Sequence, residues 1–496
     1  MAILSKSKIL NHRQCPKRLW LEINQPNLAV TDTKMQARFD VGNQVGALAR
    51  AFYPGGLMID APSRAQQLAD TARALAGSPR PVFEATFLAD DVVVRADLLL
   101  PDADGCRMVE VKSSTTVKPY HLDDTAIQYW VARQSGVPIT SVNVACIDTT
   151  FVYQGDGNYA GLLKHVDVSV TACELESKVP GWIRAARQTL DGDKPTIEIG
   201  KQCRSPYGCP FLDACSAESP RPKRLYPVEM LPYVGKFANV LRSEGIEDVR
   251  DIPPGRLDLY THERIRRVSI SGQAELDSEA TESMKRLGYP RHFIDFETLN
   301  PAVPIWRGTR PYQVVPFQWS CHTEEKDGSI AHHEFLASGT DDPRRAFAES
   351  LAAALSRTGP VFVYNAGTER THMQNMAALF PDLAPVLEEA IEWIVDLLPM
   401  TRQCYYHPDM MGSYSIKDVL PTIAPELGYD NLEVGGGEQA MQVFAELMNP
   451  DLPDARRTSL RESLLSYCER DTLAMVKVAH FFENGVIQKP STRIVE

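Results

Sequence analysis

Alternating apolar and polar residues predict a group of strands in the first third of the chain. The stretches PVFEATFL, DVVVRADLLLP and GCRMVEVKSST are rich in β-branched residues and are separated by turn-forming residues, so each is expected to form a strand. The helical pattern DDTAIQYWVARQSG and a further apolar stretch, SVNVACIDTTFVY, follow them. Strands interleaved with helices predict an α/β core in this part of the chain.

A second group of predicted strands begins at residues 292–300, HFIDFETLN. The stretches YQVVPFQWSCHTEE and AHHEFLAS are expected to be strands, and GPVFVYNA is expected to be another after the helix DDPRRAFAESLAAALSR. The acidic residues in DDPRR favour a helix start, and mostly helical patterns continue to the end. The pattern therefore predicts a second α/β core.

The chain of 496 residues is too long for one hydrophobic core, so several domains are expected. The stretch SAESPRPKRLYPVEML is rich in proline, serine and charge, which is typical of a linker, and short helical patterns follow it. We therefore predict one domain at 1–217, a small helical connector at 218–290 and a second domain at 291–496.

Composition and charge narrow the class of protein. The chain is 44% hydrophobic and 23% charged, and it contains no apolar run long enough for a membrane span and no signal-peptide pattern, so a cytoplasmic protein without a membrane partner is expected. A net charge of −12 argues against a protein that simply coats nucleic acid. It does not exclude a nuclease, because bound metal ions neutralise the acidic residues of such an enzyme.

Four of the ten cysteines form a candidate metal site. Cys203, Cys209 and Cys215 follow one another with five residues between successive thiols, and Cys15 supplies a fourth ligand from the N-terminal region. Zinc sites usually contain paired cysteines two to four residues apart, and this pattern is missing. The wider spacing favours a [4Fe-4S] cluster, with zinc as the alternative.

The first predicted core contains a constellation of charged residues that suits phosphodiester hydrolysis. Asp97 lies in the second predicted strand, and Glu110 and Lys112 flank Val111 in the third, so that both point to one face. Two carboxylates can bind a metal ion, and a nearby lysine can hold or polarise an attacking water.

The Asp97…Glu110-Val111-Lys112 pattern resembles the PD-(D/E)XK nuclease superfamily. With Gln128 on the next helix and the four cysteines, it is similar to the RecB-like branch that carries an iron-sulfur cluster, which includes CRISPR-associated nucleases. The resemblance implies a restriction-endonuclease-like core in which Asp97 and Glu110 bind metal, Lys112 is catalytic and Gln128 positions the reactants.

The chain departs from that branch at two positions. Gly46 stands where many members have a histidine, and Ala132 stands where a tyrosine is often found four residues after the glutamine. If only one centre is active, these departures point to the first centre as the inactive one.

The second core contains its own acidic constellation. Asp295 and Glu297 are two residues apart in a predicted strand and share a face, where they repel each other unless a divalent metal lies between them. Glu369 is expected where a strand passes into a helix. Tyr467 and Asp471 are four residues apart and therefore lie on one face of a helix. We expect four histidines of this half to be structural or to contact substrate, namely His292, His332, His333 and His372.

This set is similar to the DnaQ-like 3′–5′ exonucleases that have a tyrosine in the third motif, and the order of elements matches an RNase H-like core. The resemblance implies two Mg²⁺ or Mn²⁺ ions about 3.5–4 Å apart. Asp295 would bridge them, with Glu297 and Asp471 on the ion that activates water. Glu369, where most members have aspartate, would bind the other ion, and Tyr467 would orient the water.

These observations predict a metal-dependent nuclease with two hydrolytic centres that degrades DNA, at single strands or ends, in repair or in defence against foreign DNA. Three alternatives remain open. In the first, only the DnaQ-like site is active and the other module is a nucleic-acid-binding platform. In the second, RNA is the substrate. In the third, the protein is a non-catalytic nucleic-acid-binding adaptor.

Overall fold

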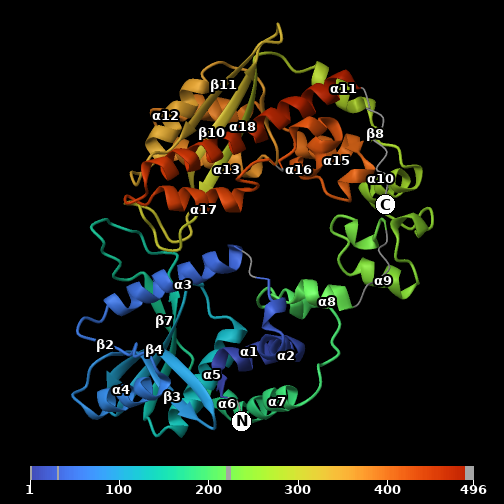
Figure 1. The fold of residues 1–496 in the computed structure, drawn as a ribbon. Coiled ribbons are helices and arrows are strands. Elements are labelled where there is room, and N and C mark those ends of the chain that lie inside the picture. The colour runs from blue at the N-terminus through green and yellow to red at the C-terminus, as the bar shows by residue number, and fades with distance from the viewer. Residues whose placement is uncertain (1–2, 31–32, 219–224, 430, 486–496) are drawn as a thin grey trace. The chain divides into compact units, whose positions relative to one another are not determined.

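The computed structural model describes residues 3–30, 33–218, 225–429 and 431–485. It has a mixed α/β fold made of two compact units (Figure 1). Unit 1 comprises Met1–Pro220 and Asn300–Gln313, and unit 2 comprises Arg221–Leu299 and Val314–Glu496. Within the described ranges, no helix combines the length and the apolar character that crossing a membrane requires.

Unit 1 is built on a seven-stranded sheet in the order β2-β3-β4-β5-β6-β7, with β1 paired to β4. The strands are β1 (Leu4–Ser5), β2 (Leu57–Met58), β3 (Val82–Ala89), β4 (Val92–Asp102), β5 (Gly105–Lys112), β6 (Ile139–Ile147) and β7 (Leu163–Asp167). Strands β3, β4 and β5 are antiparallel neighbours, whereas β5 and β6 are parallel and are connected through α5. The strands predicted from the three stretches between residues 81 and 115 are confirmed as β3, β4 and β5.

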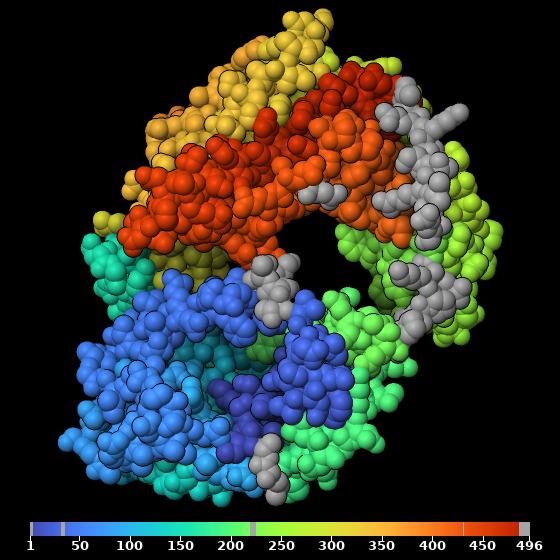
Figure 2. Space-filling view, in the orientation of Figure 1, coloured from blue at the N-terminus to red at the C-terminus, as the bar shows by residue number. Residues whose placement is uncertain are grey.

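Helices surround this sheet, and α3 and α4 form part of the visible face of unit 1 (Figure 2). The helices are α1 (Lys6–Gln14), α2 (Pro16–Asn24), η1 (Pro26–Leu28), α3 (Thr33–Ala51), α4 (Arg64–Ala76), α5 (Pro119–Gln134), α6 (Ser169–Glu176), α7 (Val179–Asp191), η2 (Lys201–Cys203) and α8 (Leu212–Glu218). Helix α5 packs on the sheet through buried residues that include Ile127 and Val131, which join side chains of β4 and β6 in the core. Its polar residues Asp124 and Gln128 are buried as well.

Unit 2 is built on a five-stranded sheet in the order β11-β10-β9-β12-β13. The strands are β9 (Arg291–Leu299), β10 (Val315–Glu324), β11 (Ile330–Leu336), β12 (Val361–Val363) and β13 (Ile394–Asp396). Strands β9, β10 and β11 form an antiparallel meander, and β12 and β13 extend it with parallel pairing on the other side of β9. Strand β9, predicted from HFIDFETLN, is therefore the central strand of the sheet.

The helices of unit 2 lie on both sides of this sheet and extend beyond it (Figure 1). They are η3 (Val228–Met230), α9 (Phe237–Ser243), η4 (Val249–Asp251), α10 (Tyr260–Ser271), α11 (Ser278–Lys285), α12 (Arg344–Ala354), α13 (Gly367–Leu379), α14 (Ala384–Glu392), α15 (Leu397–Cys404), η5 (Pro408–Met410), α16 (Ile416–Ile423), η6 (Pro425–Leu427), α17 (Gly437–Leu447) and α18 (Asp454–Asn484). A two-stranded sheet pairs β8 (Glu275–Leu276) with β14 (Tyr405–Tyr406).

The segment predicted as a connector, 218–290, packs with the C-terminal half. Val228, Leu241 and Ile265 share one buried cluster with Phe293 of β9 and Phe482 of α18. The linker pattern SAESPRPK falls partly on residues 219–224, which lie outside the described residues. Contacts thus group this segment with unit 2, while residues 300–313, between β9 and β10, are grouped with unit 1.

Candidate metal-binding acidic centres

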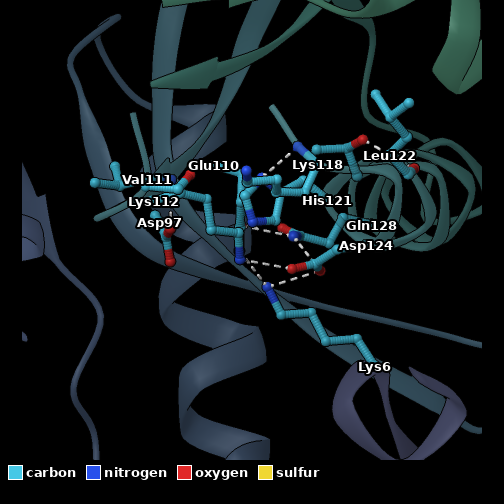
Figure 3. Close-up of polar contacts among 12 residues, drawn as sticks. Lys6, Asp97, Glu110, Val111, Lys112, Lys118, His121, Leu122, Asp124 and Gln128 are labelled. Atoms are coloured by element: carbon cyan, nitrogen blue, oxygen red, sulfur yellow. Dashed lines mark hydrogen bonds and ion pairs between the residues drawn. The ribbon is translucent and has the colours of Figure 1, made fainter. Parts of the chain in front are cut away.

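The first acidic centre lies in unit 1, where β4, β5 and α5 bring together the four residues singled out in the sequence (Figure 3). The Asp97 carboxylate accepts a hydrogen bond from the backbone N–H of Val111 at 2.7 Å. Lys112 Nζ donates to Glu110 Oε1 at 2.6 Å, and Gln128 Nε2 donates to Glu110 Oε2 at 2.6 Å. Glu110 is therefore the residue on which the strand and helix side chains converge.

Two further members of this centre, Asp124 and Lys6, are absent from the sequence prediction (Figure 3). Lys6 Nζ donates to Glu110 Oε1 at 2.8 Å and lies 3.1 Å from Asp124 Oδ1. Asp124 Oδ2 also pairs with Lys112 Nζ at 2.8 Å. Asp124 precedes Gln128 by one helical turn, so the i, i+4 spacing carried a signal for it. Lys6 had no such local signal.

Charges in the first centre compensate one another. Burial and the neighbouring Glu110 raise the pKa of Asp97 to about 7. Burial opposes the charged form of Asp124, but Lys6 and Lys112 outweigh this effect and lower the pKa of its carboxyl. Burial alone would lower the pKa of Lys6, yet Asp124 and Glu110 raise it. The carboxylates of Asp97, Glu110 and Asp124 thus share the ammonium groups of Lys6 and Lys112. Within the described residues, oxygens of these three carboxylates do not all lie within 4.8 Å of one another.

The second acidic centre lies in unit 2 between β9 and α18. Carboxylate oxygens of Asp295, Glu297 and Asp471 lie within 4.8 Å of one another. Asp295 and Glu297 occupy alternate positions of the central strand and therefore project from one face. Helix α18 lies directly on that face, because Cys468 Sγ is 3.7 Å from the backbone oxygen of Asp295.

Burial and the mutual repulsion of the acids dominate the electrostatics of the second centre, and the charge of Lys417 opposes them in part. Burial and the charge of Asp471 raise the pKa of Glu297 to about 8, and the same two causes raise the pKa of Asp295 well above its usual value. In the part of the chain that the structure describes, no lysine or arginine forms an ion pair with Asp295, Glu297 or Asp471. A site of three converging carboxylates whose charges are offset only in part fits a hard divalent cation such as Mg²⁺ or Mn²⁺.

Glu369 lies in the first turn of α13, outside the group of three converging acids. Burial raises its pKa to about 7, and its Oε2 atom is buried without a hydrogen-bond partner. The charge of Glu369 contributes to the raised pKa of Asp295, as expected for a nearby acid. The turn that leads into α13 is held by Asp396, whose carboxylate accepts from the backbone N–H groups of Asn365 and Ala366, both at 2.9 Å.

Tyr467 and Asp471 lie on one face of α18, and each has a partner that sequence reasoning missed. Lys417 Nζ, from α16, donates to the Tyr467 hydroxyl at 2.9 Å and to the backbone oxygen of Gly435 at 2.7 Å. The hydroxyl of Tyr429 donates to Asp471 Oδ1 at 2.6 Å. Burial and the charge of Asp471 raise the pKa of Tyr467, so its hydroxyl remains protonated.

The four predicted cysteine ligands line one small cavity in unit 1. Cys15 joins α1 to α2, Cys203 ends η2, and the backbone N–H of Cys209 donates to the backbone oxygen of Cys203 at 2.9 Å. Cys215 lies in α8, and burial raises the pKa of its thiol. Within the described residues, no three of these sulfur atoms lie within 4.8 Å of one another.

Comparison with known proteins gives a family model and several relatives. Residues 292–415 match the model described as "Domain of unknown function (DUF2779)". This segment contains Asp295, Glu297 and Glu369 and ends before Tyr467 and Asp471.

The relatives are distant. The uncharacterized protein UU173 of Ureaplasma parvum is 23% identical over 279 residues, which are 51% of this chain and 40% of that protein. The uncharacterized protein MG366 of Mycoplasma genitalium is 22% identical over 213 residues, 39% of this chain and 32% of that protein. The chain thus spans less than half the length of these relatives. The solved structure titled "Crystal structure of SSO0001" matches with 12% identity and a TM-score of 0.21, covering 44% of this chain and 87% of that one.

Proposed function

We propose that the protein is a metal-dependent nuclease with two hydrolytic centres that degrades DNA, at single strands or ends, in repair or in defence against foreign DNA. The observation that carries the proposal is the convergence of carboxylate oxygens of Asp295, Glu297 and Asp471 within 4.8 Å, where the single charge of Lys417 offsets their repulsion only in part. Three carboxylates are stable together in such a position when divalent cations neutralise them.

The surroundings of these acids support a DnaQ-like reading of unit 2. An antiparallel three-stranded meander extended by parallel strands on the side of β9 agrees with an RNase H-like core. Mg²⁺ or Mn²⁺, when bound, supplies charge that stabilises the transition state and lowers the pKa of a water. Asp295, Glu297 and Asp471 would hold the ions, and the unpaired Oε2 of Glu369 is available to extend the site.

The role of Tyr467 follows from its protonated hydroxyl. Lys417 Nζ donates to that oxygen, and the hydroxyl hydrogen is directed towards the carboxylate of Asp471, one of the acids that would hold the ions. Tyr467 would orient the attacking water, and Lys417 is a positioning residue that fixes the tyrosine.

The arrangement in unit 1 supports the RecB-like reading. Asp97 and Glu110 lie on neighbouring antiparallel strands, and Lys112 and the helix residue Gln128 both donate hydrogen bonds to Glu110. The four cysteines line one cavity, as ligands of one shared metal group must. The proposed group is a [4Fe-4S] cluster, with zinc as the alternative, because the cysteines lack the paired spacing typical of zinc sites.

A second candidate function has its own observation. Both oxygens of Glu110 already accept hydrogen bonds from Lys6, Lys112 and Gln128, so the first centre is compensated without a metal ion. This favours a protein in which the DnaQ-like centre alone cleaves and the first centre is a nucleic-acid-binding platform.

The test is degradation of end-labelled single- and double-stranded DNA and RNA with Mg²⁺ or Mn²⁺ by the wild type, Lys112→Ala and Asp295→Asn. If both centres cleave, each substitution removes a distinct set of products. Asp295→Asn should lower the rate at which the products of the second centre form by about 100-fold or more. If only the second works, Lys112→Ala leaves the products unchanged. A wild type that cleaves no substrate with either metal contradicts the nuclease and leaves the adaptor, whereas cleavage of RNA alone changes the substrate.

A further inference from the structure

A pair of histidines faces helix α18 at the edge of the sheet in unit 2. His322 of β10 and His332 of β11 are directly opposite each other in the strand register, and their rings stack with centroids 4.6 Å apart. One ring nitrogen of each histidine and a carboxylate oxygen of Glu469, on α18, lie within 4.8 Å of one another. His332 Nδ1 is 4.0 Å from the Glu469 carboxylate.

Hydroxyl groups hold one nitrogen of each ring. The single hydroxyl hydrogen of Thr472 can be donated within its own helix, to the backbone oxygen of Glu469 at 3.0 Å or of Cys468 at 3.4 Å. In that arrangement Thr472 Oγ1 accepts from Ser320 Oγ at 2.8 Å and from His322 Nδ1 at 2.9 Å. Because the hydrogen of Ser320 is thereby used, Ser320 Oγ accepts from His332 Nε2 at 2.9 Å.

The network thus leaves a lone pair on His322 Nε2 and another on His332 Nδ1. No hydrogen-bond donor contacts either nitrogen among the residues that the structure describes. A metal-ligating histidine usually has its second ring nitrogen held by a hydrogen bond, as the hydroxyl groups of Thr472 and Ser320 hold these two rings.

We propose that His322, His332 and Glu469 form a binding site for one divalent transition metal ion, Zn²⁺. Imidazole nitrogens prefer such an ion to Mg²⁺, and two histidines with a carboxylate form a known zinc ligand set. The half-exposed Glu469 side chain can move to complete the site, and water occupies the fourth position. The site differs from the acidic centre, whose ligands are all oxygens.

The bound ion would fasten α18 to the edge of the sheet. Glu469 lies on the side of α18 near β11, whereas Tyr467 and Asp471 face the acidic centre on β9. Zinc at this place holds the helix in the position in which Asp471 reaches Asp295 and Glu297. The inference stands without the nuclease activity, because only zinc binding and stability are needed to test it.

The test is calorimetric titration of the whole protein with Zn²⁺ in excess Mg²⁺, together with thermal melting. The double variant His322→Asn, His332→Gln removes both free nitrogens but keeps N–H donors near Thr472 and Ser320. It should bind one zinc equivalent fewer than the wild type, and most of the zinc-dependent rise in Tm should be lost. His333→Asn, on the same strand with its exposed side chain on the opposite face, should behave as the wild type.

An unchanged zinc stoichiometry and an unchanged rise in Tm in the double variant would overturn the proposal. If the double variant does not fold, Glu469→Gln provides the decision, because Glu469 is exposed enough to be replaced without loss of core packing. That variant should weaken zinc binding at this site by about 10-fold or more. Wild-type affinity in a folded Glu469→Gln variant contradicts the site.

Discussion

Lys6 occupies the position in the first acidic centre where a cation is most needed. Its ammonium group lies within 3.1 Å of both Glu110 and Asp124, and it extends from the first residue of α1 (Figure 3). A divalent ion that binds Glu110 has to replace one of the donors already on its oxygens. Lys6 is the donor from outside the sheet and α5, so we expect it to be the one that leaves.

Replacing Lys6 by methionine should therefore strengthen metal binding at the first centre. Without the competing ammonium group, Mn²⁺ affinity should rise about 10-fold, which corresponds to about 1.4 kcal/mol. The measurement is electron paramagnetic resonance titration with Mn²⁺ in an Asp295→Asn, Glu297→Gln background, which removes binding at the second centre.

Lys8→Met in the same background is the control for this experiment. Lys8 lies on the same helix and, in the described part of the chain, forms no ion pair. Its replacement should leave the Mn²⁺ affinity unchanged. An affinity for Lys6→Met that equals or falls below that of Lys8→Met would show that the lysine assists metal binding or has no part in it.

Helix α1 connects the cysteine cavity to the first acidic centre. It begins at Lys6, and Cys15 follows its last residue, Gln14. The Gln14 side chain donates to the backbone oxygens of Gln202 and Tyr207, both at 2.7 Å, in the segment that carries Cys203 and Cys209. One short, rigid element thus spans from the proposed cluster to Glu110.

Loss of the proposed cluster should destabilise unit 1 and loosen α1. Cys215→Ser should lower the stability of unit 1 by about 3 kcal/mol or more, because metal binding contributes directly to folding, and this corresponds to a fall in Tm of about 6–12 °C. Hydrogen exchange detected by mass spectrometry should show faster exchange in α1. Cys173→Ser, at an exposed thiol of α6, is the matched control. Equal Tm and exchange in the two variants would contradict a structural role for the cavity.

Elements with a strong local pattern were predictable from the sequence. Short stretches rich in apolar and β-branched residues, bounded by turn residues, predicted strands β3, β4 and β5 in 81–115, and the apolar run at 292–300 predicted β9, which is buried on both faces. The strand period of two placed Asp295 and Glu297 on one face, and the helical spacing of four placed Tyr467 with Asp471.

Contacts between residues that lie far apart in the sequence were not predictable. Lys6 reaches Glu110 because β1 pairs with β4 in parallel, with Leu4 opposite Val92, and no local pattern marks a two-residue strand. Lys417 reaches Tyr467 from another helix, α16, across the second centre. Long-range packing determines both contacts, and a single sequence contains no periodic signal of it.

At the scale of the whole molecule, one segment of chain from between two strands of unit 2 belongs to unit 1. Strands β9 and β10 are antiparallel neighbours in unit 2, yet the residues between them, 300–313, pack in unit 1. Val303 of this segment is 3% exposed and shares a buried cluster with Val45 and Leu162. The Tyr312 hydroxyl donates to the backbone oxygen of Ser113, the residue after Lys112. The strand that carries Asp295 and Glu297 therefore continues directly into the core around the first centre.

A charged residue at position 303 should lower the stability of unit 1 and leave that of unit 2 unchanged. Val303→Asp places a carboxylate in an apolar cluster without a partner, so unit 1 should lose about 3 kcal/mol. Val314→Asp, at a position that is 42% exposed, should change stability by no more than about 0.5 kcal/mol. Urea denaturation with hydrogen exchange should show lost protection around Val45 and Leu162 and retained protection in β9 and α18. An equal loss of protection in both units would mean that the two units unfold together. In that case, residues 300–313 would couple the stability of the second centre to that of the first.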